Sequence, residues 1–290
     1  MRFPMGVVAN GVGHLSGIFM ETDAKKKPKI TVDLAYLQCG SGPDVVGISG
    51  FGCAGWLLQP LADVMGRHVR LWLPDHRGMG RSPPGDDMDY DLDDMARDVL
   101  ALIQTRIGHP VAIFGVSMGG FIVQRLLALA PAWITRAAIL CSTSGGPRFR
   151  PLFTFWGAAQ MEKVLAMDPL AYARWILEPP VSPCLARYPE TYDFLLQKRL
   201  DNPENALQVM SQYHAMAQFF QDAQDLSSIT IPVWVGCGER DPVFPAANSR
   251  LLAASLPRGS LTFFPETDHL FFCEQSTEVG HALLNFFLSP

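Results

Sequence analysis

The stretch Gly115-Val116-Ser117-Met118-Gly119 places a serine between small residues, where a strand-like pattern gives way to a helix-like one. The preceding residues, Val111 to Phe114, are short and apolar, and the residues from Gly120 to Ala130 favour a helix. A tight strand-to-helix turn excludes bulky neighbours and pushes the serine hydroxyl out above the sheet. The G-x-S-x-G pattern alone is equally typical of an ordinary glycine-rich turn, so the rest of the chain has to decide.

Composition favours one large α/β core with an insertion. The 290 residues are 48% hydrophobic and 18% charged, which allows a sizeable core and disfavours disorder. The formal net charge is −5 and Lys25-Lys26-Lys27 is the only basic cluster, so neither nucleic acid nor an anionic membrane is an expected partner. The sequence contains no run of the roughly 20 apolar residues that a membrane span needs.

The spacing of the cysteines and the absence of cofactor-binding motifs from the sequence bear on whether the protein uses disulfides, a metal or a cofactor. Six cysteines are scattered without a C-x-x-C pair, which predicts small buried side chains in a reducing, cytoplasmic compartment. We find no His/Cys/Asp cluster with metal-ligand spacing, no G-x-G-x-x-G and no P-loop. We therefore expect neither a metal nor a cofactor.

Short apolar strands and amphipathic helices alternate along most of the chain. This alternation predicts an α/β fold with a mostly parallel sheet covered by helices on both faces. It is interrupted near Ser144 and resumes after Ser228, and the intervening segment is helical and rich in aromatic residues. We therefore expect a core formed by residues 1–144 and 229–290, with a helical lid over residues 145–228. The predicted strands are 18–22 and 30–37 as a hairpin, 45–48, 69–73, 111–114, 137–141, 231–236 and 261–264.

Partners for a nucleophilic serine follow two of the later predicted strands. A serine needs a base, and the base needs an acid that orients it. Asp241 lies in the loop after the strand at 231–236, and His269 lies in the loop after the strand at 261–264. Loops at the carboxyl ends of parallel strands meet at one edge of the sheet, where such sites are found. The order Ser117, Asp241, His269 is the order expected of a serine triad on this architecture.

With these motifs the sequence resembles the α/β-hydrolase fold family from about Ile30 to the C-terminus. Ser49-Gly50-Phe51-Gly52 stands where that family forms half of its oxyanion hole, although the family usually has histidine in place of Ser49. The stretch from Asp75 to Ser82 is similar to the family's D-x-R-G-x-G-x-S loop, which braces the fold. A weaker similarity, to enol-lactonase-like esterases, rests on Asn202 to Ala206 and Gln212 to Met216.

The resemblance assigns a role to each site residue. Ser117 is the nucleophile, His269 the general base and Asp241 the acid that holds the imidazole, while the backbone N–H groups of Phe51 and Met118 form the oxyanion hole. Glu239 and Asp268 are competing acids. We favour Asp241 because it matches the family position, whereas Asp268, directly beside His269, is expected to point elsewhere.

The aromatic insertion suggests an apolar pocket. We expect more than half of its aromatic and methionine side chains to form the lid's own core. The candidates for lining the substrate pocket are Trp156, Trp175, His214 and Phe219, and His214 is also explained as a packed helix residue.

The expected function is a serine hydrolase that cleaves an ester or lactone of a small, apolar substrate through an acyl-enzyme. The same triad serves C–C bond hydrolases, thioesterases, peptidases of the proline iminopeptidase type and acyltransferases, and a hydrolase-like receptor for a small ligand is a further alternative. The apolar, glycine-rich residues 1–17 are compatible with a flexible arm or with a packing segment in a homodimer.

Overall fold

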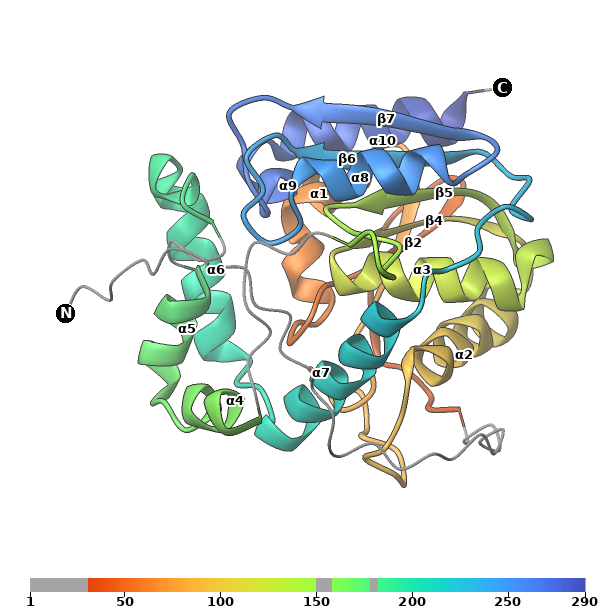
Figure 1. Ribbon diagram of the computed structural model, residues 1–290. Helices are drawn as coiled ribbons and strands as arrows, with labels where there is room; N and C mark the ends of the chain where they lie inside the picture. Colours follow the sequence, from red (N-terminus) through yellow and green to blue (C-terminus); the bar gives the residue numbers. More distant parts are fainter. Residues whose placement is uncertain (1–30, 150–157, 178–181, 290) are drawn as a thin grey trace.

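A seven-stranded sheet forms the centre of the computed structural model, which describes residues 31–149, 158–177 and 182–289 (Figure 1). The strand order is β1-β3-β2-β4-β5-β6-β7, and β1 is antiparallel to β3 while every other pair is parallel. The strands are β1 Tyr36–Gly40, β2 Asp44–Ile48, β3 Arg70–Pro74, β4 Val111–Val116, β5 Ile134–Leu140, β6 Val233–Gly238 and β7 Gly259–Phe264.

The strand predicted at residues 30–37 is wrong in its limits. We expected it over residues 30–37, whereas β1 begins only at Tyr36. The backbone before it is bound by side chains instead of a neighbouring strand: the Val32 N–H donates to Asp98 Oδ1 at 2.7 Å, and the Ala35 N–H donates to Ser82 Oγ at 2.9 Å. The hairpin partner predicted at 18–22 lies outside the described residues.

Helices cover both faces of the sheet, as the alternating pattern predicted (Figure 1). Buried side chains of α2, α3 and α8 form one hydrophobic cluster, and those of α1, α9 and α10 form the other. The two clusters explain why the central strands are apolar on both sides. The helices of these layers are α1 Gln59–Met65, α2 Leu92–Leu102, α3 Met118–Leu129, α8 Ala246–Ala254, α9 Phe271–Glu274 and α10 Ser276–Leu288.

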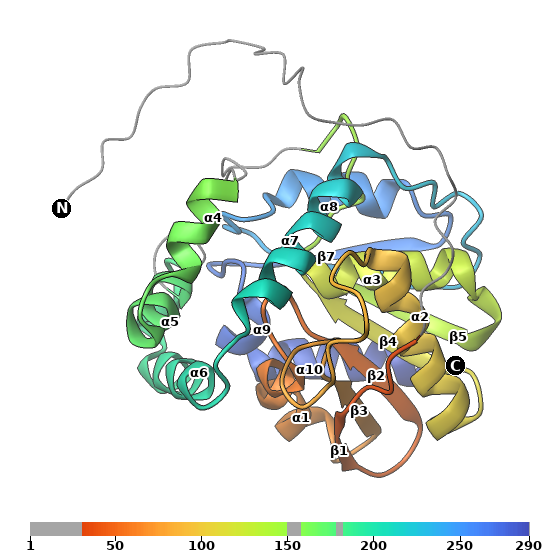
Figure 2. The ribbon, with the colours of Figure 1, turned by 90° about the horizontal axis from the view of Figure 1, so that it is seen from below.

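Four further α-helices of the described residues lie in the chain between β5 and β6, within the segment 145–228 that we call the insertion. Figures 1 and 2 show α4, α5 and α6 grouped beside the core, with α7 running back towards α3. Phe219 of α7 stacks on Phe121 of α3, with ring centroids 4.5 Å apart, and so ties the insertion to the core. Their bounds are α4 Ala158–Leu165, α5 Pro169–Leu177, α6 Pro189–Asp201 and α7 Ala206–Gln221. None of the described helices has the length and apolar character that crossing a membrane requires.

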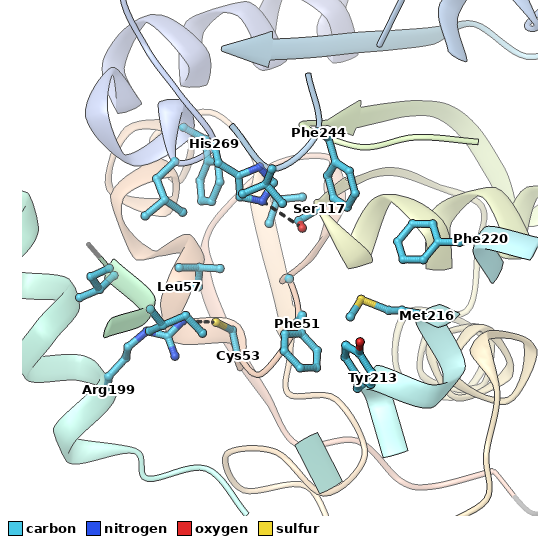
Figure 3. A pocket seen from close by; sticks show the side chains of 17 residues that line it. Phe51, Cys53, Leu57, Ser117, Arg199, Tyr213, Met216, Phe220, Phe244 and His269 are labelled. Carbon is cyan, nitrogen blue, oxygen red and sulfur yellow. Dashed lines mark hydrogen bonds between the residues drawn. The ribbon is translucent and has the colours of Figure 1, made fainter. Parts of the chain in front are cut away.

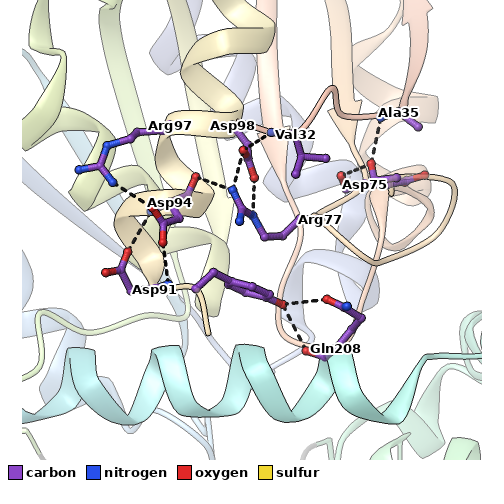
Figure 4. A network of polar contacts seen from close by, with 11 residues as sticks. Val32, Ala35, Asp75, Arg77, Asp91, Asp94, Arg97, Asp98 and Gln208 are labelled. Carbon is purple, nitrogen blue, oxygen red and sulfur yellow. Dashed lines mark hydrogen bonds and ion pairs between the residues drawn. The ribbon is translucent and has the colours of Figure 1, made fainter. Parts of the chain in front are cut away.

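A buried ion pair fixes the loop after β3 (Figure 4). Arg77 donates from Nε and Nη2 to the two carboxylate oxygens of Asp98 at 2.7 and 2.8 Å, and both residues are at most 2% exposed. The guanidinium also lies over the Tyr90 ring, whose hydroxyl donates to the Gln208 carbonyl oxygen of α7 at 3.3 Å. Arg77 therefore braces the fold, which is the role that the sequence suggested for this loop.

Candidate active site

Ser117 occupies the sharp turn between β4 and α3. Its backbone is at φ 54 and ψ −118, a conformation that costs energy for a residue with a side chain. The flanking glycines make the turn sterically feasible, because a Cβ on Gly115 would lie 2.3 Å from the Gly119 carbonyl oxygen and one on Gly119 would lie 2.3 Å from that of Ile48. Two hydrogen bonds hold the turn, from the Ser117 N–H to the Leu140 carbonyl and from Ser142 Oγ to the Ser117 carbonyl.

His269 and Asp241 reach Ser117 from the loops after β7 and β6. His269 Nε2 lies 3.1 Å from Ser117 Oγ, and His269 Nδ1 lies 2.9 Å from Asp241 Oδ2. The other Asp241 oxygen, Oδ1, accepts hydrogen bonds from the N–H groups of Val243 and Phe244, both at 2.8 Å. These contacts fix the carboxylate plane, so that one oxygen is left to face the imidazole. The three predicted side chains are thus brought into one hydrogen-bonded chain.

The competing acids lie away from the imidazole nitrogens. Glu239 is exposed. Asp268 is fully buried, and its oxygens accept hydrogen bonds from Ser182 Oγ at 2.7 Å and from the Cys184 N–H at 2.5 Å. Ser182 and Cys184 belong to the insertion, so Asp268 serves to attach the insertion to the loop that carries His269.

Cys184, Asp268 and Glu274 form a buried group of potential metal ligands that the sequence did not indicate. One ligand atom of each lies within 4.8 Å of the others. The carboxylate oxygens already have protein partners: Ser182 Oγ lies 3.0 Å from Glu274 Oε1, and the Asp268 N–H donates to Glu274 Oε2 at 3.4 Å. Hydrogen bonding within the fold therefore accounts for this cluster.

The loop after β2 approaches the serine from the other side. A Cβ on Gly50 would lie 3.4 Å from Ser117 Cβ, so the backbone of this loop passes directly beside the serine. Phe51 of this loop lines the cavity together with Ser117, and Met118 is the first residue of α3, where backbone N–H groups have no partner within the helix. His76 holds the loop through a 2.9 Å contact from Nε2 to the Ser49 carbonyl oxygen. Burial lowers the pKa of His76, which favours the neutral ring.

A cavity of about 170 Å³ lies beside Ser117 and His269 (Figure 3). Its lining is dominated by apolar side chains from the core and the insertion. The described residues that line it are Gly50, Phe51, Cys53, Leu57, Val116, Ser117, Ile176, Leu177, Arg199, Tyr213, Met216, Phe220, Val243, Phe244, His269, Leu270 and Phe272.

The three predicted pocket residues that fall in the described part of the insertion do not line this cavity. His214 is exposed, and Phe219 packs into the core against Phe121. Trp175 is half-buried on α5, where it lies near Tyr172, and the next two residues of that helix face the cavity instead. Trp156 lies outside the described residues. The prediction failed because the rotation of each helix about its axis decides which neighbour faces the pocket.

Several lining residues were missed, although α7 carried a signal for three of them. Tyr213, Met216 and Phe220 are spaced i, i+3 and i+7, which places them on one helical face. Arg199 and Cys53 gave no such signal. Arg199 lies in the polar stretch Gln197-Lys198-Arg199, which is typical of a solvated helix face, yet it is only 9% exposed.

Known proteins resemble this chain along most of its length. The sequence profile of the Alpha/beta hydrolase family matches residues 45–280. BpoC of Mycobacterium tuberculosis, which carries the name of a non-heme bromoperoxidase, is 28% identical over 261 residues, 89% of this chain and 98% of the relative. Its crystal structure superposes with a TM-score of 0.75 at 27% identity, covering 90% of this chain and 97% of that one.

Two further relatives are named as enzymes that act on esters or lactones. The pimeloyl-[acyl-carrier protein] methyl ester esterase of Chromobacterium violaceum is 25% identical over 84% of this chain and 94% of its own length. The enol-lactonase of Burkholderia xenovorans LB400 has a TM-score of 0.74 at 20% identity, covering 88% of this chain and 96% of that one, and shows the shared fold. The chain therefore belongs to the alpha/beta hydrolase family and is an enzyme of that family.

Proposed function

We propose that the protein is a serine hydrolase that cleaves a carboxylic ester or lactone of a small, largely apolar substrate. The observation that carries this proposal is the hydrogen-bonded chain from Ser117 through His269 to Asp241, whose serine and histidine line a mainly apolar cavity. The relatives named as a methyl ester esterase and an enol-lactonase support the same bond type.

The proposed reaction begins at Ser117 Oγ. His269 Nε2 accepts the hydroxyl proton while Oγ forms a bond to the carbonyl carbon, and Asp241 stabilises the imidazolium that results. The N–H groups of Phe51 and Met118 are proposed to donate to the oxyanion, a kind of contact worth about 3–4 kcal/mol per donor in another hydrolase. The imidazolium then protonates the departing alkoxide, which leaves an acyl-enzyme.

Water completes the cycle by the same route. His269 Nε2 takes a proton from water as its oxygen attacks the acyl carbon, and returns that proton to Ser117 Oγ as the acid departs. With a lactone the alkoxide stays tethered to the acyl group, so the single product is a hydroxy acid. Because backbone N–H groups fix Asp241, its other oxygen holds the proton on His269 Nδ1 throughout the cycle, and only Nε2 gains and loses a proton.

We further propose that the insertion, residues 145–228, acts as a lid. Ile176 and Leu177 of α5 and the Tyr213 face of α7 contribute to the cavity wall opposite the sheet. An apolar cover of this kind excludes bulk water and strengthens the electrostatic interactions beneath it. The cavity selects substrates with a compact apolar acyl or alcohol group.

The proposal is tested by initial rates on aryl esters of increasing acyl length, together with an enol-lactone and an acyl-thioester. We expect turnover on the esters and on the lactone, an optimum at a short chain, and loss of turnover in Ser117→Ala. Ser260→Ala, at an exposed serine of β7, is the matched control and is expected to retain full activity. Unchanged turnover in Ser117→Ala contradicts the proposal.

The same panel separates the alternatives that share the triad. A preference for the thioester favours a thioesterase, and product formation that requires an added alcohol favours an acyltransferase. Inactivity on all three classes, with cleavage of a vinylogous diketone or of an N-terminal prolyl peptide, favours a C–C bond hydrolase or a peptidase. Binding without turnover favours a receptor.

A further inference from the structure

Arg199 of α6 places a buried cation in the wall of the mainly apolar cavity. Figure 3 shows its guanidinium near Cys53, away from Ser117 and His269. Of the described lining residues, Arg199 and His269 are the ones with a basic side chain. Leu57, Ile176 and Leu177, which share the lining with Arg199, offer no polar side-chain group.

The guanidinium is only partly satisfied by the protein. Nη1 donates to Glu204, and Nη2 donates to Cys53 Sγ at 3.2 Å. Nε has no hydrogen-bond partner among the described residues, and the side chain is 7% exposed. A buried donor without an acceptor is unfavourable, so a ligand that supplies an acceptor gains more here than at a solvated site.

The charge around Arg199 is already balanced. The Glu204 side chain is 8% exposed and forms an ion pair with the guanidinium. Burial raises the pKa of Glu204, an effect that the Arg199 charge opposes. Burial also raises the pKa of the Cys53 thiol to about 11, so this sulfur is neutral at pH 7. A second carboxylate here would be repelled by Glu204 and would lose its hydration, whereas a neutral oxygen meets neither cost.

We propose that Arg199 binds a neutral hydrogen-bond acceptor, a ketone or amide carbonyl oxygen, on a part of the substrate remote from the scissile bond. This inference rests on the proposed hydrolase function, and it specifies the substrate as an oxo- or acylamino-substituted ester or lactone. Arg199 is a specificity-determining residue in this account. It fixes the orientation of the substrate in a cavity whose walls are mainly apolar.

Matched esters test the inference. Methyl 5-oxohexanoate is compared with methyl hexanoate, and 4-oxopentyl acetate with pentyl acetate, so that the carbonyl is placed on either side of the ester. Monomethyl glutarate is the anionic counterpart of the first oxo-ester. In the wild type we expect kcat/KM to favour an oxo-ester over its plain partner by about tenfold in at least one pair, as for a hydrogen bond to a charged group. Monomethyl glutarate should be a poorer substrate than methyl 5-oxohexanoate.

Two variants connect the preference to Arg199. Arg199→Met combined with Glu204→Gln removes both charges together, and the oxo/plain ratio should fall to about one. Arg199→Lys keeps the cation but lacks the Nε donor, so it should lose the preference as well. This variant provides the test if the double variant does not fold. Arg174→Met, at an exposed arginine of α5, is the matched control and should keep the wild-type ratio.

The outcomes separate this inference from the hydrolase proposal. The inference is overturned if the oxo/plain ratio is near one in the wild type, or if the wild-type preference persists in the Arg199 variants. It is also overturned if monomethyl glutarate is a better substrate than methyl 5-oxohexanoate. If no ester is hydrolysed, the hydrolase proposal fails, and calorimetric binding of the same pairs to Ser117→Ala decides the role of Arg199. Equal affinity for the oxo and plain ligands then overturns the proposed role of Arg199, and tighter binding of an oxo ligand supports it.

Discussion

Positive φ values among the described non-glycine residues occur at the edge of the sheet that carries the proposed chemistry. Of the described non-glycine residues, Ser117, Cys141 and Glu266 have positive φ values of 54, 42 and 60. They follow β4, β5 and β7, so all three lie at the carboxyl edge of the parallel sheet. Strained residues persist where the surrounding structure over-determines them, and Ser117 is held by hydrogen bonds through both its N–H and its carbonyl.

Asp241→Asn tests the role of the acid without disturbing the turn that holds it. The N–H groups of Val243 and Phe244 require an oxygen at Oδ1, so the new amide nitrogen must face His269 Nδ1. The imidazole then carries its proton on Nε2 and cannot accept the one on Ser117. We expect kcat to fall by about 10³–10⁴-fold, as for the corresponding change in a serine protease, with the unfolding midpoint nearly unchanged.

The control for this prediction is Glu239→Gln, at the exposed acid two residues earlier in the chain. It should leave the ester hydrolysis rate at the wild-type level. If Asp241→Asn retained more than a tenth of the wild-type kcat, another group would have to orient His269.

At the scale of elements, the insertion is attached to the loop of His269 through a buried carboxyl pair. Ser182 Oγ lies 2.7 Å from Asp268 Oδ1 and 3.0 Å from Glu274 Oε1. One hydroxyl has a single proton, so both contacts are satisfied at once when Ser182 donates to Asp268 and a protonated Glu274 donates to Ser182. Burial, with Asp268 nearby, raises the pKa of Glu274 to about 9.

This pair predicts a pH dependence of stability. Glu274 releases its proton near its ordinary pKa in the unfolded chain but only near pH 9 in the folded one. Between these values the folded state holds the extra proton, so the free energy of unfolding should fall as the pH rises. Glu274→Gln mimics the protonated side chain and should flatten this slope. Urea denaturation at intervals from pH 5 to pH 9 measures the free energy of unfolding of the wild type and of Glu274→Gln. Equal pH slopes for the two proteins would contradict the proton that we place on Glu274.

The elements also show what a sequence can predict about such a site. The turn at Ser117 and the loops of Asp241 and His269 were found because their signals are local: glycines required by a tight turn, and polar residues directly after apolar strands. His214 and Phe219 were misplaced because the facing of α7 depends on its contact with Phe121, which is distant in sequence. Arg199 was missed because its burial results from α6 packing near Trp56, with the guanidinium 5.7 Å from the indole centroid.

At the scale of the molecule, the Arg77–Asp98 pair joins segments that are far apart in the sequence (Figure 4). Asp98 of α2 accepts from Arg77 and from the Val32 N–H, and Arg77 lies over Tyr90, which contacts α7. The pair thus connects the entry to β1, the loop after β3 and the insertion. Both partners are almost fully buried, so removal of one leaves an uncompensated charge.

Asp98→Asn should therefore cost about 3–5 kcal/mol of unfolding free energy, as for other broken buried pairs. Arg77→Met combined with Asp98→Leu removes both charges and should recover most of that loss. Guanidinium denaturation of Arg77→Met, of Asp98→Leu and of the double variant gives the coupling between the residues. Additive losses in the double variant would show that the two side chains contribute independently.

The central claim is that Ser117 becomes acylated during turnover, and the most direct measurement is trapping with a reactive phosphonate ester. The protein is incubated with the phosphonate, and intact-mass and peptide mass spectrometry are followed alongside loss of ester hydrolysis. We expect one adduct per chain, located on Ser117, that forms in step with the loss of activity, and no adduct in Asp241→Asn on the same timescale. Complete inactivation with the adduct on another residue, or full activity after Ser117 is labelled, would contradict the central claim.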